Sequence, residues 1–311
     1  MSELKRREFL SLIAASPLAF RLKAGATGSD AVGSSSGGFR LQVESRIKVG
    51  YAAITWGGDD PKAIEEVSAV GFKGIQLRAS AFDRWSANPG ELKTLLAAHR
   101  LAFPVLSSGN LNYQPKDVAA NIEMHVTHAK FVRDAGGEML QVIDQKPRDR
   151  AVIPDDYARL ADALNDLGNR TRSIGVPLVY HHHMNSTGEP PAAIEAIMRG
   201  ASAASVGLLF DIAHYQQGGG DPVRFIREHG QAITVVHLKD VRPIEAAPGY
   251  QWVELGRGRV DVKGCVAALR GAGFSGWAMV ELDRVVDSGG TPKASAEANR
   301  GFVVNQLGLA L

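Results

Sequence analysis

The sequence contains a single cysteine, Cys265, among 311 residues. One thiol excludes an intrachain disulfide and a cysteine-rich zinc site. Cys265 lies in the apolar segment VKGCVAALRGAG, which we interpret as a helix in which the thiol is a small buried residue rather than a reactive group. The sequence therefore gives no support for thiol chemistry.

The chain also lacks an excess of charge and a long apolar run. Its 35 Lys and Arg residues against 33 Asp and Glu residues give a formal net charge of +2, which offers no electrostatic basis for binding nucleic acid or an anionic membrane. No segment approaches the roughly 20 apolar residues that span a bilayer, so we expect no stable membrane anchor. With 45% hydrophobic and 22% charged residues, the composition is that of a globular protein with a sizeable core.

The first residues are similar to an export signal. Lys5-Arg6-Arg7-Glu8-Phe9-Leu10 resembles a twin-arginine motif, a short apolar segment follows, and Ala24-Gly25-Ala26 has the form of a signal-peptidase site. The alternative is a frayed basic helix with an accidental arginine pair. We predict a signal peptide over 1–26, a flexible Gly/Ser-rich tether over 27–45, and a periplasmic or otherwise exported protein.

From residue 46 onward, short apolar runs alternate with helical segments without a break in composition. Strands separated by helices at intervals of about 33 residues are typical of repeated βα units. An open doubly wound sheet is the alternative, but the number of units and the lack of a Gly-rich phosphate loop favour an α/β fold of the (β/α)8 TIM barrel type, one domain over 46–311. The predicted strands are Ile47–Thr55, Gly74–Arg78, Ala102–Ser107, Met139–Ile143, Pro177–His181, Val206–Asp211, Ile233–His237 and Trp277–Glu281.

Four of these strands finish on a residue type that binds metals. The runs VPLVYHHH, VGLLFDIAH, ITVVHLKD and WAMVELD break at His181, Asp211, His237 and Glu281. The carboxyl ends of barrel strands meet at one mouth, so two imidazoles and two carboxylates would converge there on one divalent cation. Each residue alone has a plainer interpretation as a core histidine, a polar strand end or a helix cap. Together they predict a metal site.

Several strings resemble a known family: VYHHHMNSTGE, LLFDIAHYQQGGGDP, VVHLKDV, ELGRGRVDV and GWAMVELDR. They are similar to the sugar phosphate isomerase/epimerase superfamily, the xylose isomerase-like TIM barrels, and within it to inosose dehydratase-like proteins. The likeness extends from about Lys48 to Leu307. It implies metal ligands Glu, Asp, His and Glu on strands five to eight, matched here by Asp211, His237 and Glu281. His181 stands where Glu is usual, which makes the site less negative and favours Mn, Co, Fe or Zn over Mg.

Such a site suits a substrate with adjacent carbonyl and hydroxyl groups, because a Lewis acid stabilises the enediolate formed when the α-proton leaves. We expect a keto-sugar or cyclitol as the small-molecule partner and isomerisation, epimerisation or dehydration as the reaction. Lys239, His183 and His214 are the candidate acid–base residues. Lys239 would have its pKa lowered by a neighbouring metal; otherwise it forms a salt bridge to Asp240 or Asp283.

Other residues near strand ends are candidates for contact with substrate. Trp56 could stack on a sugar ring or pack under a loop, and Gln76 and Gln141 could hydrogen-bond hydroxyl groups. Arg257, which stands between two glycines, could close over an anionic or hydroxylated substrate. Arg78 and Ser107 are similarly placed. The alternatives are an exported sugar-binding barrel without catalysis and, with less support, a metal phosphodiesterase like endonuclease IV, which would need more ligands and a basic DNA track. A homodimer is common for such barrels.

Overall fold

The computed structural model describes residues 47–311 apart from 288, and within them eight parallel strands close into a barrel. The strands follow one another around the barrel in the order β1, β2, β3, β4, β5, β6, β7 and β10, and β10 pairs with β1. Their bounds are β1 Lys48–Ala52, β2 Gly74–Arg78, β3 Ala102–Leu111, β4 Met139–Asp144, β5 Leu178–His181, β6 Val206–Asp211, β7 Ile233–Leu238 and β10 Trp277–Val280. The predicted (β/α)8 barrel is confirmed.

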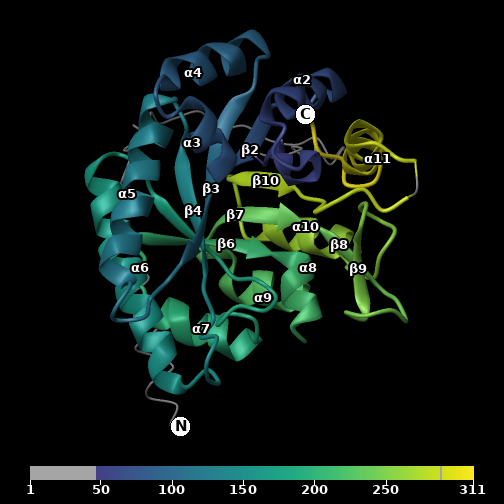
Figure 1. Ribbon diagram of the computed structural model, residues 1–311. Coiled ribbons are helices and arrows are strands. Elements are labelled where there is room, and N and C mark those ends of the chain that lie inside the picture. Colours follow the sequence, from purple (N-terminus) through teal and green to yellow (C-terminus); the bar gives the residue numbers. More distant parts are fainter. Residues whose placement is uncertain (1–46, 288) are drawn as a thin grey trace, which may run out of the picture. The chain divides into compact units, whose positions relative to one another are not determined.

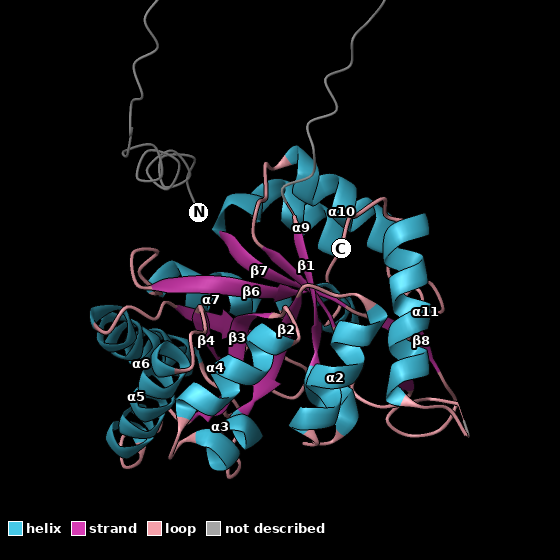
Figure 2. Ribbon diagram, turned by 90° about the horizontal axis from the view of Figure 1, so that it is seen from above, coloured by secondary structure: helices cyan, strands magenta, loops and turns pink. Residues whose placement is uncertain are grey.

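Helices surround the barrel, as Figure 2 shows with strands in magenta and helices in cyan. They are α2 Asp60–Val70, α3 Ala79–Trp85, α4 Pro89–Ala98, α5 Val118–Asp134, α6 Pro154–Ser173, α7 Pro191–Gly200, α8 Ile212–Gln217, α9 Pro222–His229, α10 Val262–Gly271 and α11 Pro292–Asn305, with 3-10 helices η1 Ala53–Trp56 and η2 Gly230–Ala232. Among the described residues, no helix is long and apolar enough to cross a membrane. The proposed signal peptide, the tether and residue 46 lie outside the described residues.

Sequence patterns placed most strand bounds within a few residues. The first predicted strand was too long, because the chain turns into η1 after Ala52 and Gly57 ends that turn with a φ of 64°. Asp221 caps α9 by accepting the Arg224 N–H, and Asp59 caps α2 by accepting the Lys62 N–H. The sequence did not predict the antiparallel hairpin of β8 Asp240–Pro243 and β9 Tyr250–Val253, which follows β7 and lies near α8 and α11 in Figure 1.

The barrel interior is built in layers, because side chains two residues apart on a strand point to the same face. A dry layer contains Val105, Met139, Val179, Leu209, Val235, Trp277 and Met279. Trp277 fills the axis so closely that a Cβ at Gly74 would overlap its ring, which explains glycine there. Two residues further along five of these strands stand Gln141, His181, Asp211, His237 and Glu281. The apolar layer therefore supports a polar layer directly above it, at the carboxyl ends of the strands.

Asp240 organises the segment that follows β7. Its buried carboxylate accepts four backbone N–H groups, those of Val241 and Val260 on Oδ1 and those of Gly256 and Gly258 on Oδ2, at 2.8 to 3.0 Å. An N–H donated to a buried carboxylate stabilises the fold because the charge is solvated by the backbone and not by water. One side chain thus fixes the β8–β9 hairpin and the glycine-rich turn after it.

Replacing this carboxylate by an amide is expected to destabilise the protein. In Asp240→Asn, the new NH2 group faces two backbone N–H donors, so the free energy of unfolding should fall by about 2–4 kcal/mol. Urea denaturation measures the change, with the exposed Asp162→Asn as a control that should stay within about 0.5 kcal/mol of the parent. Equal stability of both variants would contradict this role.

Candidate metal and substrate site

The four predicted metal ligands meet at the carboxyl end of the barrel. Asp211 Oδ2 lies 3.7 Å from His181 Nε2 and 3.5 Å from His237 Nδ1, and His237 Nδ1 lies 3.4 Å from Glu281 Oε2. All four residues are buried. Their ligand atoms form two overlapping groups that share Asp211: one with His237 and Glu281, the other with His181 and His214. His214, which the sequence suggested as an acid–base residue, lies in α8 and belongs to this second group.

The two oxygens of Asp211 have different partners. Oδ1 accepts the N–H groups of Ala213 and His214 at 2.9 Å and so caps α8. The neighbouring His182, which points away from His181 as strand alternation predicts, accepts the Asp211 backbone N–H through Nε2 at 3.1 Å. Oδ2 has no hydrogen-bond partner among the described residues. Helix capping and metal binding, which the sequence offered as alternatives for Asp211, are therefore compatible.

These residues fit a divalent cation. Asp211 Oδ2, His237 Nδ1 and His181 Nε2 are buried and unpartnered within the described chain, which is costly unless a cation or ligand satisfies them. Burial lowers the pKa of His181 to about 4, so its imidazole is neutral, as a ligand must be. Although burial opposes it, His237 and Lys239 lower the pKa of Glu281 to about 2. The donor set of imidazole and carboxylate suits Mn, Co, Fe or Zn.

Lys239 is held between two carboxylates. Its buried Nζ donates to Glu281 Oε1 at 2.8 Å and to Asp283 Oδ1 at 2.5 Å. Burial favours the neutral amine, but Asp283 and Glu281 outweigh it and raise the pKa of Lys239. The two ion pairs stabilise the ammonium, and the lowering of its pKa by a bound metal stays a prediction. Asp283, rather than Asp240, is the salt-bridge partner among the two that the sequence suggested. The carboxylates of Glu281, Asp283 and Asp211 carry three negative charges, and the Lys239 ammonium carries one positive charge. The net charge of −2 is what one divalent cation would balance.

His183 and His214 lie beside the cluster with their rings 3.8 Å apart between centroids. His183 Nδ1 donates to the Met184 carbonyl at 2.7 Å, which leaves Nε2 as a hydrogen-bond acceptor on a half-buried ring. His214 Nδ1 accepts the Met184 N–H at 3.2 Å. Burial holds the pKa of His214 well below its ordinary value, so this ring is neutral. Both rings are close enough to the cluster to act on a bound substrate.

Gln76 and Gln141 belong to the cluster, although the sequence suggested them as contacts for substrate hydroxyl groups. Gln76 Oε1 accepts from His237 Nε2 at 2.9 Å, and Gln76 Nε2 donates to Gln141 Oε1 at 2.7 Å. Gln141 Nε2 donates to His181 Nδ1 at 2.9 Å. The two amides therefore orient the two imidazoles, a function typical of side chains around a metal site.

Two other predicted contacts are engaged elsewhere. The buried Trp56 packs edge-on against Tyr51 and donates its indole N–H to Glu66 at 2.7 Å, which matches the packing alternative. Arg257 is half-exposed and pairs with Glu254 and Asp287 at 3.2 and 2.9 Å. No described contact joins either residue to the four predicted ligands.

An aromatic side chain that the sequence did not indicate does reach the cluster. Trp252 of β9 lies with its ring centroid 4.6 Å from Lys239 Nζ and 4.6 Å from the His214 ring. It also lines a pocket of about 310 Å³ with Ile244, Ala247, Pro248, Tyr250, Gln251, Arg284 and Val286. In the sequence this residue is the tryptophan of YQWV, which follows HLKD. Its place at the site could be recognised only from the hairpin, which folds back over the barrel mouth.

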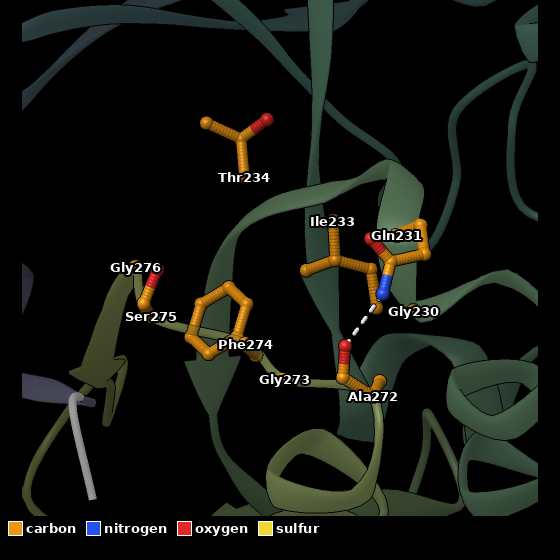
Figure 3. Close-up of a pocket in the computed structure, with 9 residues that line it drawn as sticks. All are labelled: Gly230, Gln231, Ile233, Thr234, Ala272, Gly273, Phe274, Ser275 and Gly276. Atoms are coloured by element: carbon orange, nitrogen blue, oxygen red, sulfur yellow. Dashed lines mark hydrogen bonds between the residues drawn. The ribbon is translucent and has the colours of Figure 1, made fainter. Parts of the chain in front are cut away.

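A further cavity, of about 350 Å³, lies near the starts of β7 and β10. Figure 3 shows its lining between Gly230 and Gly276, with Gln231 donating to the Ala272 carbonyl. No titratable side chain lines it, and it is at the amino ends of the strands, away from the metal ligands. TIM barrels carry their chemistry at the carboxyl ends, so we place the site there.

Comparison with known proteins gives sequence relatives over most of the chain. It is 27% identical over 274 residues to inosose dehydratase of Lacticaseibacillus casei, covering 76% of this chain and 90% of the relative. It is 30% identical over 277 residues to the rhizopine catabolism protein MocC of Rhizobium meliloti, covering 76% of this chain and 82% of the relative.

Solved structures show the same fold. An IolI protein with a bound zinc atom superposes with a TM-score of 0.71 at 17% identity, over 84% of this chain and 98% of the other. An L-ribulose 3-epimerase gives a TM-score of 0.71 at 19% identity, over 84% and 95%. The model of the xylose isomerase-like TIM barrel family matches residues 64–303, more than half of the chain. With the closed eight-stranded barrel and this match, the chain belongs to the xylose isomerase-like TIM barrel family.

Proposed function

We propose that this protein is a metal-dependent enzyme that dehydrates, isomerises or epimerises a keto-sugar or keto-cyclitol through an enediolate. The observation that carries the proposal is the buried group of Asp211, His237 and Glu281, in which two ligand atoms have no partner within the described chain. The relatives named as inosose dehydratases support a substrate of the sugar or cyclitol class.

Asp211, His237 and Glu281 would hold the cation, and His181 is the fourth candidate ligand. A divalent metal bound there would supply Lewis acidity, which stabilises negative charge on a carbonyl oxygen next to the proton that leaves. The chain's own residues would bind and orient the substrate and move its proton.

His183 is the best-placed base. Its Nδ1 proton is fixed on the Met184 carbonyl, so the lone pair on Nε2 is free to accept a proton from substrate carbon. Lys239, an ammonium held by Glu281 and Asp283, is suited to stabilise or protonate a departing or developing oxyanion. A base that follows β5 and an acid that follows β7 favour loss of a β-hydroxyl, that is dehydration, over exchange between two carboxylate bases.

Trp252 and the pocket beside it would bind the ring of the substrate. Carbohydrates place an apolar face on aromatic side chains, and Trp252 connects the 310 Å³ pocket with Lys239 and His214. A plain sugar, a cyclitol or an oxidised glycoside such as a 3-keto sugar fits better than a phosphorylated one, because the sequence has no Gly-rich phosphate loop. Export through the twin-arginine pathway, which we also propose, agrees with an unphosphorylated substrate.

Metal content tests the first element of this proposal. The mature protein, residues 27–311, should retain about one Mn, Co, Fe or Zn ion per chain, as expected for a site of imidazole and carboxylate ligands. Asp211→Asn should lose it, because the amide oxygen can still cap α8 while the NH2 replaces Oδ2, which is the free oxygen. Elemental analysis of both proteins gives the answer; absence of metal from the parent even after reconstitution would favour a sugar-binding barrel.

Exchange of substrate hydrogen with solvent tests the chemistry. Incubation of keto-sugars and inososes in D2O should give deuterium at the carbon next to the carbonyl, detected by mass spectrometry. Glu281→Gln should reduce the rate by at least about 100-fold, because loss of this ligand weakens the hold on the cation that would stabilise the developing negative charge. The exposed Glu297→Gln is the matched control and should keep the parent rate. Binding of sugar without any exchange in the parent protein would support the non-catalytic alternative.

The two tryptophans give a test of substrate binding. Trp252→Ala should raise KM by about 10-fold, equivalent to the 1–1.5 kcal/mol of an aromatic contact, with a smaller change in kcat. Trp56→Phe, which removes an indole that donates to Glu66, should lower stability and leave KM unchanged. The reverse pattern would assign the sugar platform to Trp56.

A further inference from the structure

Four buried side chains form a single hydrogen-bonded chain beneath the site. It connects His237 Nε2 to Gln76, Gln76 to Gln141, and Gln141 to His181 Nδ1, at 2.9, 2.7 and 2.9 Å. The exposed fractions of these four residues are 3% or less. Water cannot replace any of these bonds without opening the barrel, so each amide must satisfy its neighbour.

This chain has a direction. A carboxamide has a donating and an accepting end, so the two amides must point the same way; otherwise two oxygens or two NH2 groups would face each other at 2.7 Å. A neutral imidazole carries one ring proton. If His237 donates through Nε2, its Nδ1 is bare and His181 accepts through Nδ1, which places the His181 proton on Nε2. In the reverse direction the two histidines exchange roles. The amides thus leave one of the two rings with a bare nitrogen facing Asp211.

The surrounding charges select the direction. His237 Nδ1 lies between two carboxylates, 3.5 Å from Asp211 and 3.4 Å from Glu281, whereas His181 Nε2 faces Asp211 alone at 3.7 Å. A cation is most stable where it contacts both carboxylates, and there it requires the bare nitrogen of His237. The hydrogen bonds of the structure run in this same direction.

We propose that His181 is a hydrogen-bond donor to a substrate oxygen and not a metal ligand, because the Gln76–Gln141 pair fixes its proton on Nε2. This inference rests on the proposed metal site and defines it more narrowly as Asp211, His237 and Glu281. The donor lies in the ligand group that does not contain Glu281, and a keto-sugar oxygen that gains negative charge would need such a donor. The site would then recognise a carbonyl or hydroxyl oxygen through a neutral imidazole.

Binding of Co²⁺ to the metal-free protein tests the assignment without reference to activity. Titration against a chelator should show that His237→Asn weakens binding by at least about 100-fold, the upper range for loss of support around a metal and a lower bound for loss of a ligand. His181→Asn should weaken it at least about 10-fold less than His237→Asn does, because His181 lies outside the coordination shell. Circular dichroism and thermal unfolding confirm that both variants fold.

Gln141→Glu supplies a gain-of-ligand test with nearly the same shape. A carboxylate accepts on both oxygens, from Gln76 and from His181 Nδ1–H, so the His181 proton moves to Nδ1 and its Nε2 becomes bare. In this background His181 should join the coordination shell and Co²⁺ should bind more tightly. His181→Asn should then cost at least about 10-fold, and the difference from its cost in the parent is the coupling between residues 141 and 181.

The outcomes separate this inference from the proposed function. If the parent binds Co²⁺ and His181→Asn weakens binding as much as His237→Asn, the donor assignment is overturned while the metal enzyme stands. The donor assignment is also overturned if His181→Asn costs equally in the parent and in Gln141→Glu. If the parent binds no Co²⁺ or other divalent ion, the proposed function fails and this inference fails with it.

Discussion

The alternation of side chains along the barrel strands is the constraint on which the site depends. Residues two apart point inward together, so the apolar layer from Val105 to Met279 and the polar layer above it are consequences of one register. Trp277 belongs to this apolar layer, and its ring packs against Gly74. The imidazoles and carboxylates consequently lie directly above a layer of apolar side chains. There, electrostatic interactions are stronger than in water, and each unpaired polar atom is costly.

The carboxylates of Asp211 and Asp240 use their oxygens in different ways. Asp211 uses one oxygen to begin α8 and turns the other to the imidazoles. Asp240, next to the site lysine, uses both oxygens to accept backbone N–H groups and takes no part in the charge balance around Lys239. The hairpin that Asp240 supports in turn carries Trp252 to the mouth of the barrel. The position of Trp252 next to Lys239 thus depends on the local fold that the adjacent Asp240 stabilises.

The replacement of a carboxylate by His181 changes more than the charge of the site. An imidazole at this position needs a partner that fixes its proton, and Gln141 and Gln76 provide it by connecting it to the histidine across the barrel. The two imidazoles are therefore not independent: the proton position of one determines that of the other. The two amides fix the proton positions of both imidazoles and carry no charge themselves. A bare nitrogen for a metal and an N–H donor can therefore stand in the same layer.

The sequence by itself determined the barrel, the strand ends and the identity of the residues at the mouth, because buried parallel strands have a clear apolar signal that breaks where each strand ends. It could not determine which of these residues contact each other. That Lys239 pairs with Asp283, that Trp252 rather than Trp56 reaches the cluster, and that Gln76 and Gln141 connect two histidines 56 residues apart are contacts across the barrel. Such contacts arise from closure of the sheet and the return of the hairpin. Their partners are distant in sequence and leave no local pattern, so only the tertiary structure decided them.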